Sequence, residues 1–403
     1  NPTEAIIVPT NQLQTRFLKG IMEKVTEFED SLFYDVSAWS LPHAYGVKSH
    51  ELKQNPKTHM GSQLEEVFLD GGEVIGGKAK SAYIMKWNRY YAPKSLYKIL
   101  DSGILPRLAN APFSTIINGN KVEFERGSIV IPVNQRDADS RITQRQIHQL
   151  MERLSKSDHV QIYASNTAAT ASGSFLGGAT HTVLEKPKVA ILSGSGTSSY
   201  GVGEIWHLTN SRMKIPSSLL NAENLNKWKL ANYNTIIVPD GYYQELESID
   251  IQNLKEWVLN GGTLIGTQTG SQWLINKKII NEKVKSTENM KLDIPYDQVR
   301  TVSGAQRIGG AIFEVELDET HPIAYGYNKK TSLFRRGTHF FELSEGPSAN
   351  VGRYTNNPLV SGYISEEKAA EIKNTASIIA RRQGLGHVVL FADNPSFRAF
   401  WYG

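Results

Sequence analysis

Two glycines around position 268 have the spacing of a turn that can place a nucleophile above a sheet. Residues 266–270 read Gly-Thr-Gln-Thr-Gly, which fits the G-x-Nuc-x-G pattern of a sharp strand-to-helix turn, where small flanking residues let the backbone approach closely. The central residue, Gln268, is an amide without a nucleophilic oxygen. Thr267 and Thr269 carry hydroxyls but flank the exposed position. The pattern therefore predicts either a ligand site that hydrogen-bonds through amides or a turn kept for packing.

A second candidate site is the loop at residues 193–203, which follows an apolar run and opens a helical segment. Backbone N–H groups at such a junction can hold an anion. The loop lacks the lysine of phosphate-binding loops, and its G-x-G is not followed by the rest of the dinucleotide fingerprint. We therefore take Ser198, Ser199 and Tyr200, together with Gln268, as candidates for ligand binding, and do not favour a nucleotide.

Three further side chains near these turns suggest acid–base chemistry. Glu204 and His207 are three residues apart and so share one face of the expected helix. Asp240 follows another apolar run. Glu204 and His207 would act either as a general acid and base pair or as a structural hydrogen-bonded pair, and a hydrolase would use Asp240 with them around one crevice.

The metal-binding patterns in the chain are incomplete. The chain has no cysteine, which excludes disulfides, thiolate ligands and cysteine nucleophiles. His339 and Glu342 form an H-x-x-E pattern, but their surroundings alternate like a strand, which would point the two side chains to opposite faces. A catalytic zinc also needs a third ligand and an open position. We expect no cofactor and no metal site within this chain.

Length and charge limit the remaining function classes. At about 150 residues per domain, the 403 residues predict two or three domains. The net charge of +4 gives no basic surface for nucleic acid or anionic lipid. No apolar run approaches the roughly 20 residues of a membrane span. The apolar start and aromatic finish suggest a piece cut from a longer polypeptide or, alternatively, a processed protein.

The elements that must position these candidates alternate short apolar runs with segments of helical period. Strands are expected at residues 82–85, 128–133, 160–164, 189–192, 235–239 and 262–266, and helices at 90–101, 147–154, 203–209 and 251–258. This alternation predicts parallel strands with helices on both faces. Several runs recur at nearly constant spacing, which suggests an internal duplication; similar α/β order without common descent is the alternative.

We predict an α/β fold made of two tandem, doubly wound, mostly parallel sheets flanked by helices, of flavodoxin-like type. The first domain covers residues 1–180, including an added segment at 1–81. Residues 172–187 form the linker. The second domain covers 187–403, with a polar excursion at 276–300 and some antiparallel closing strands.

Smaller elements complete this prediction. We expect a strand at 5–8, a helix through 17–25, a hairpin near 71–77, closing strands at 313–317, 338–341, 359–364 and 387–391, and a helix at 366–382 that ends near Gly384.

Several strings in the sequence resemble a known family. They are residues 5–16, 187–192, 197–200, 203–208, 233–241, 261–265 and 393–399. Together they look like the region after the catalytic domain in large bacterial zinc carboxypeptidases of the carboxypeptidase A type, a region similar to class I glutamine amidotransferases. The resemblance covers nearly the whole chain.

This resemblance implies a secreted or periplasmic parent peptidase with one zinc, whose zinc ligands, substrate-binding arginine and catalytic glutamate lie upstream of this region. The amidotransferase cysteine corresponds to Gln268. We therefore expect a catalytically silent accessory region that docks on the peptidase domain of the same polypeptide or binds a peptide or glycan. The alternatives are a hydrolase that uses Glu204, His207 and Asp240, and a ligand-binding module that uses Ser198, Ser199, Tyr200, Gln268 and Thr269.

Overall fold

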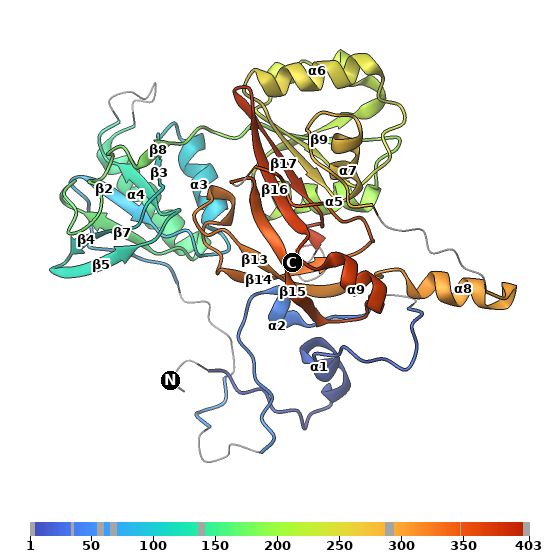
Figure 1. The fold of residues 1–403 in the computed structure, drawn as a ribbon. Helices are drawn as coiled ribbons and strands as arrows, with labels where there is room; N and C mark the ends of the chain where they lie inside the picture. The colour runs from blue at the N-terminus through green and yellow to red at the C-terminus, as the bar shows by residue number, and fades with distance from the viewer. Residues whose placement is uncertain are drawn as a thin grey trace.

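The computed structural model describes residues 5–33, 36–54, 60–64, 71–135, 142–286, 294–346 and 348–397. Part of the predicted polar excursion, residues 287–293, and the last six residues lie outside this range. Two large sheets dominate the described chain, one at the left of Figure 1 and one at the right. They confirm the predicted α/β class, with both parallel and antiparallel pairing.

The first sheet has six short strands in the order β1-β7-β2-β6-β3-β8. The strands are β1 (Val74–Ile75), β2 (Ala82–Met85), β3 (Arg107–Ala109), β6 (Ile129–Pro132), β7 (Ile162–Ser165) and β8 (His181–Val183). A separate hairpin joins β4 (Phe113–Ile117) to β5 (Asn120–Phe124), and the helices are α3 (Ala92–Asp101) and α4 (Gln144–Asp158). The linker predicted at 172–187 thus contains an edge strand.

Helix α4 forms where the periodicity predicts it. Thr143 caps its start, accepting a hydrogen bond from the Gln146 N–H at 3.3 Å, and the Gln146 side chain accepts one from the Thr143 N–H at 2.9 Å. Such a reciprocal cap satisfies two backbone donors that the helix itself cannot pair. The apolar positions Ile147, Met151 and Leu154 are buried in the core of the first sheet. Burial of each such side chain contributes about 1.5–3 kcal/mol.

The predicted parallel direction is wrong for most of the first sheet. β2 runs antiparallel to both of its neighbours, β6 and β7, and β3 runs antiparallel to β6 and β8; β1 and β7 form the parallel pair. β6 and β7 therefore share a direction, with α4 as the crossover, but β2 lies between them. The strand order also differs from that of the second sheet, which argues against the duplication. The hairpin predicted near 71–77 is instead this parallel pairing of β1.

The second sheet has nine strands in the order β10-β9-β11-β12-β17-β16-β15-β13-β14. The strands are β9 (Val189–Ser193), β10 (Ser217–Asn221), β11 (Thr235–Val238), β12 (Thr263–Thr267), β13 (Ala311–Leu317), β14 (Lys330–Arg335), β15 (Asn350–Ser361), β16 (Ala376–Gln383) and β17 (Gly386–Phe391). The first five in this order are parallel, and the last four pair antiparallel. The predicted parallel domain with antiparallel closing strands is thus confirmed here.

Helices and short turns connect these strands. They are α5 (Ser199–Trp206), a π-helix η3 (His207–Arg212), the 3-10 turns η4 (Ala222–Lys227), η5 (Leu230–Asn232) and η6 (Pro322–Ala324), α6 (Ser248–Leu259), α7 (Thr269–Asn276), α8 (Tyr296–Ala305) and α9 (Glu366–Ile372). α5 packs on one sheet face through Val202 and Ile205, beside Ile191. α6 and α7 contribute to the core on the other face through Leu254 and Leu274.

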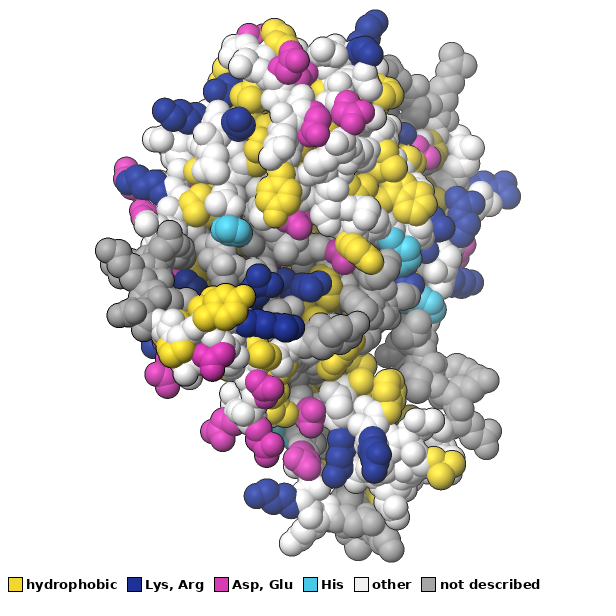
Figure 2. Space-filling view, turned by 90° about the vertical axis from the view of Figure 1, so that its right-hand side faces the viewer, with side chains coloured by type: hydrophobic (Ala, Val, Ile, Leu, Met, Phe, Trp, Pro, Cys, Tyr) yellow, Lys and Arg dark blue, Asp and Glu magenta, His cyan; other side chains and the backbone are white. Residues whose placement is uncertain are grey.

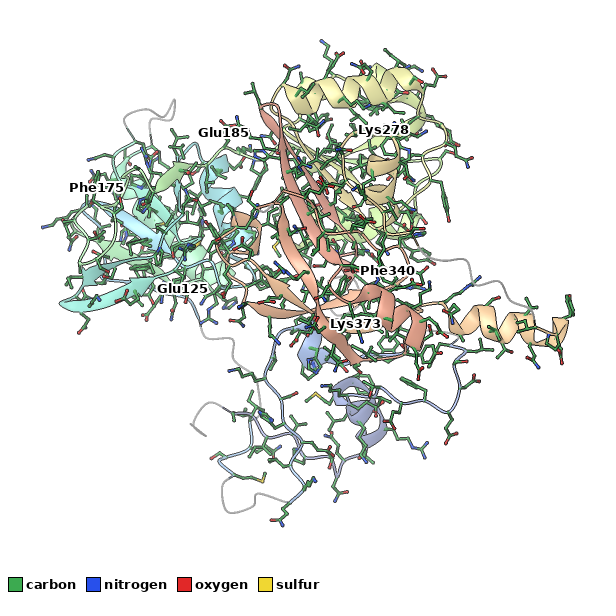
Figure 3. All side chains as sticks on the ribbon, viewed as in Figure 1. Glu125, Phe175, Glu185, Lys278, Phe340 and Lys373 are labelled. Carbon is green, nitrogen blue, oxygen red and sulfur yellow. The ribbon has the colours of Figure 1, made fainter. Side chains whose placement is uncertain are left out.

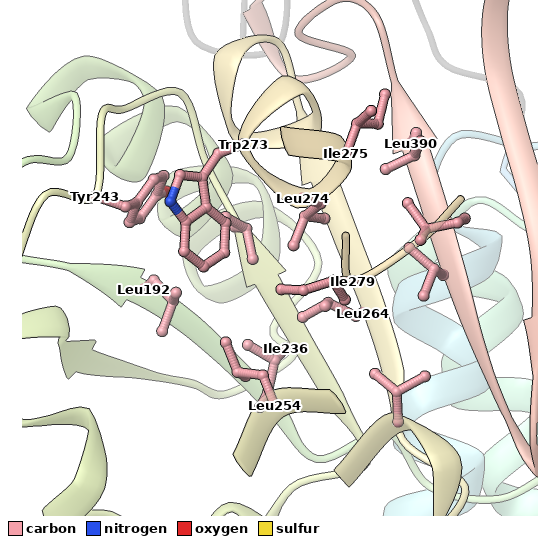
Figure 4. Packing of buried hydrophobic residues seen from close by; sticks show 14 of the residues in the cluster. Leu192, Ile236, Tyr243, Leu254, Leu264, Trp273, Leu274, Ile275, Ile279 and Leu390 are labelled. Atoms are coloured by element: carbon pink, nitrogen blue, oxygen red, sulfur yellow. The ribbon is translucent and has the colours of Figure 1, made fainter. Parts of the chain in front are cut away.

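The largest core lies between this sheet and α6 and α7. Figure 4 shows Ile236 and Leu264 from the sheet packing against Leu254 and Leu274 from the helices. All four side chains are fully buried. Strands buried on both faces read as continuous apolar runs, which explains why β9, β11 and β12 are visible in the sequence.

The segment predicted as one helix at 366–382 contains both a helix and a strand. α9 ends at Ile372, and β16 begins at Ala376 after Asn374, whose φ is +57°. The β-branched Ile378 and Ile379 favour a strand. Gly384 belongs to the turn between β16 and β17, where a Cβ would lie 2.8 Å from the Leu259 carbonyl oxygen.

The N-terminal segment contacts the second sheet, although the sequence assigned it to the first domain. The N–H of Val25 donates to Ser361 Oγ at 3.2 Å, and the N–H of Ser37 donates to the Gly310 carbonyl at 2.8 Å. The segment contains α1 (Thr15–Met22) and α2 (Leu41–Ala44), at the lower part of Figure 1. The strand expected at residues 5–8 is not formed.

The first sheet touches the second through the segment before β14. Tyr325 Oη donates to the Asn110 carbonyl at 3.5 Å. Gly326 has φ +85°, and a Cβ there would lie 2.8 Å from the Trp87 carbonyl oxygen, so glycine permits this close approach. Figure 2 shows one face of the molecule, on which charged side chains of both signs are spread and a group of Lys and Arg lies near the centre. Among the described residues, no helix has the length and apolarity to cross a membrane.

Candidate functional site

The turn between β12 and α7 has the elbow geometry that the glycine spacing suggests. Gln268 has φ +49° and ψ −123°, a backbone conformation that L-residues rarely adopt. Its N–H donates to the Phe391 carbonyl at 3.0 Å, and its carbonyl accepts from the Gln272 N–H at 3.2 Å. A Cβ on Gly270 would lie 2.1 Å from the Pro239 carbonyl oxygen, so this position requires glycine. The strained turn is therefore fixed by β17 through Phe391 and by the loop after β11 through Pro239.

Thr269 links the elbow to the loop after β11. Its hydroxyl donates to Asp240 Oδ1 and accepts from the Gly241 N–H at 2.8 Å. Its N–H also faces Asp240 Oδ1 at 3.4 Å. The Thr269 hydroxyl thus serves to join two loops, and the Asp240 carboxylate is fixed at the edge where the parallel strands end.

The loop after β9 joins the same edge. Ser198 caps α5, its Oγ accepting from the Gly201 N–H at 3.2 Å, and its own N–H donates to the Asp240 carbonyl at 2.8 Å. The N–H of Tyr242 donates to the Gly196 carbonyl at 2.7 Å. The predicted loop and Asp240 are therefore in direct contact.

This edge lies at a reversal in strand order. The chain passes from β9 to β10 on one side of β9, and then to β11 on its other side. In open α/β sheets, ligands bind outside the carboxyl ends of the strands where the order reverses. Tyr200 and Tyr242 stand at this reversal, and both are mostly exposed. Ser199, the first residue of α5, is also exposed.

Glu204 is a buried carboxyl group beside these loops. Only 5% of the residue is exposed, and burial raises its pKa to about 7, with the negative charge of Asp240 adding to the rise. The Asn394 amide donates a hydrogen bond to Glu204, and this bond and the nearby Arg336 both oppose the rise. Glu204 is therefore partly protonated near neutral pH. His207, its predicted partner, begins the half-buried π-helix η3.

Sequence reasoning missed Asn394 and Arg336. From the sequence, His339 was considered only as a zinc ligand. In the structure, burial and the charge of Arg335 lower the pKa of His339, and the charge of Asp240 opposes this shift. The strand expected at 338–341 is not formed, apart from a bridge at Phe341. Among the described residues, no group of three His, Asp or Glu side chains has a metal-binding arrangement.

A buried ion pair positions the loop that carries Asn394. Arg335 donates to Asp393 Oδ1 at 2.7 Å and to Tyr354 Oη at 2.9 Å, and Tyr354 in turn donates to Asp393. The guanidinium lies 4.7 Å from the ring centre of Phe340, which is labelled in Figure 3. Cation–π contact and hydrogen bonds offset part of the cost of burying these charges.

Comparisons with known proteins show structural likeness without sequence matches. No protein-family model and no curated protein matches the chain. Similar solved structures include a β-galactosidase from Bacillus circulans sp. alkalophilus (14% identity, TM-score 0.33, covering 52% of this chain and 29% of that one). A putative ThuA-like protein from Bacteroides uniformis has 12% identity and a TM-score of 0.32, and the match covers 51% of this chain and 81% of that one. A glutamine amidotransferase from Thermotoga maritima has 14% identity and a TM-score of 0.32, and the match covers 51% of this chain and 74% of that one.

The chain therefore spans less than a third of the β-galactosidase. Of the three structures just named, one is a glutamine amidotransferase, and none is a carboxypeptidase. The fold class itself follows from the strand order and direction described above.

The chemistry available at this edge is hydrogen bonding and proton transfer. An amide at the elbow donates and accepts hydrogen bonds but does not attack a carbonyl carbon. Asp240 accepts hydrogen bonds, and Glu204 exchanges a proton near neutral pH.

Proposed function

We propose that the chain is a non-catalytic binding region whose ligand site is the edge formed by Gln268, Asp240, Ser198 and Tyr200. The observation that carries this proposal is the strained backbone at Gln268, which puts an amide where a covalent enzyme has its nucleophile. Strain of this kind costs about 1–3 kcal/mol and persists at functional positions. Within the described chain, the Gln268 amide makes no hydrogen bond to protein, so it is available to a ligand.

A thermal-shift screen with amino acids, dipeptides, oligosaccharides and nucleosides tests this proposal. We expect one class to raise the melting temperature of the wild-type chain, because a ligand that binds only the folded state stabilises it. Gln268→Ala should abolish the rise, and Gln272→Ala, a change of the same residue type within α7, should not. A screen without any Gln268-dependent rise would contradict the proposal.

We further propose that this region accompanies a secreted or periplasmic zinc carboxypeptidase and docks on its peptidase domain. The support is the sequence resemblance described above. The chain assayed alone on peptides with free C-termini and on glutamine, with and without zinc, should show no turnover. Activity that survives repurification and disappears in Glu204→Gln would contradict a silent accessory role.

One observation favours a second candidate function, hydrolysis without a covalent intermediate. Glu204 has a pKa of about 7 and lies within electrostatic reach of Asp240, so a proton donor and a carboxylate share one site. Under this candidate, hydrolysis of some substrate would depend on both Glu204 and Asp240, and His207 would contribute to proton transfer. A rate that falls as pH rises through about 7 would support it over simple binding.

A further inference from the structure

Two exposed tyrosines belong to the segments that form the proposed ligand site. Tyr200 is 77% exposed and Tyr242 is 78% exposed. Tyr200 lies in the first turn of α5, and Tyr242 lies in the loop after β11. The two segments are joined by backbone hydrogen bonds: the Ser198 N–H donates to the Asp240 carbonyl, and the Tyr242 N–H donates to the Gly196 carbonyl. A tyrosine ring presents a large apolar face and a polar tip at little entropic cost, which suits it to binding surfaces.

Two polar side chains on the same group of loops, Asp240 and Gln268, can still form hydrogen bonds. Asp240 is half-buried, and Thr269 bonds to its Oδ1; within the described chain its Oδ2 accepts no hydrogen bond. The amide of Gln268, also half-buried, offers one acceptor and two donor hydrogens. A half-buried polar group without a partner has lost part of its hydration, so a ligand that supplies hydrogen bonds is favoured there.

These features suit a ligand with an apolar face and a polar edge. A sugar ring has this character, because its axial C–H bonds form an apolar face and its hydroxyls lie around the rim. One carboxylate oxygen accepts from a hydroxyl, and the amide donates to one hydroxyl and accepts from the next.

We propose that the edge framed by Tyr200 and Tyr242 binds a neutral carbohydrate, with sugar rings stacked on the tyrosines and hydroxyls bonded to Asp240 and Gln268. This inference rests on the proposed binding function and names its ligand class. The strand-order reversal between β9 and β11 supports the position independently.

The test is calorimetric titration of the full chain with neutral oligosaccharides of glucose, galactose, mannose and xylose. We expect at least one to bind, and Tyr200→Ala and Tyr242→Ala each to weaken its binding by about tenfold, which corresponds to about 1.4 kcal/mol. Tyr296→Ala is the matched control, because Tyr296 is a 95% exposed tyrosine on α8. It should bind as the wild type does.

Several results would overturn the carbohydrate assignment. One such result is that no oligosaccharide binds. Another is that an oligosaccharide still binds after both tyrosines are replaced by alanine in a variant that melts at the wild-type temperature. A dipeptide that gives a Gln268-dependent thermal shift, while no oligosaccharide binds, would refute the carbohydrate and leave the binding function standing. A screen in which no class gives a Gln268-dependent shift would refute both.

Discussion

The stability of the protein should fall as pH rises through neutrality because of Glu204. Its carboxyl group has an ordinary pKa of 4.5, and burial raises the folded-state pKa to about 7. Between these two values the folded chain holds a proton that the unfolded chain releases. The resulting contribution to stability is fully present below about pH 4.5 and is lost as pH rises through about 7.

The size of this effect follows from the separation of the two pKa values. Each pKa unit corresponds to about 1.4 kcal/mol, so ionising Glu204 in the folded protein costs about 3 kcal/mol. Glu204→Gln keeps an uncharged side chain of similar shape that cannot ionise. Above pH 7 the variant should therefore gain up to about 3 kcal/mol relative to the wild type.

Urea unfolding of both proteins from pH 4 to 9 measures this difference. We expect the free energy of unfolding of the wild type, minus that of Glu204→Gln, to fall by about 3 kcal/mol between pH 4 and 8. Glu223 is exposed, and Glu223→Gln should keep the pH dependence of the wild type. If Glu204→Gln also keeps that dependence, the Glu204 carboxyl group is not a buried neutral acid.

Three other variants probe how the site is built. Gln268→Gly should be at least as stable as Gln268→Ala in urea unfolding, because glycine adopts the positive φ of this position without strain. At the control position within α7, Gln272→Gly should be about 1 kcal/mol less stable than Gln272→Ala. If the glycine variant is the less stable one at both positions, the backbone at Gln268 is not strained. Gly270→Ala should cost about 1–3 kcal/mol or more, since its Cβ meets backbone of the β11 loop; an unchanged unfolding midpoint would contradict that contact. Arg335→Ala should cost about 3–5 kcal/mol because it leaves the buried Asp393 carboxylate without its partner; a loss below about 1 kcal/mol would show that the pair is solvated.

The second sheet could be predicted from the sequence because its parallel strands are buried on both faces. β9, β11, β12 and β17 each appear as an apolar run, and α6 shows the expected helical period. Apolar runs do not encode direction, however. The sequence therefore does not predict that β2 runs in the opposite direction between the parallel strands β6 and β7.

The residues of the site were only partly predictable. Glycine spacing identified the turn at Gln268, since a Cβ at Gly270 would collide with the neighbouring loop. The spacing of polar residues after the apolar runs also singles out Asp240 and Glu204. Asn394 was missed because its role depends on β17 lying beside β12, a pairing between segments far apart in the chain. Its position three residues after a buried strand was the available signal.

If the elbow holds a ligand without reacting with it, the side-chain amide resonance of Gln268 should report the binding. The measurement is an NMR titration of the 15N-labelled full chain with the oligosaccharides and dipeptides above, with the Gln268 signal assigned from Gln268→Ala. We expect the Gln268 amide signal to shift on titration with the bound ligand, to return on dialysis, and the recovered ligand to be unchanged in mass. A ligand that binds without moving that resonance, or that is recovered cleaved, would contradict a binding role for the Gln268 elbow.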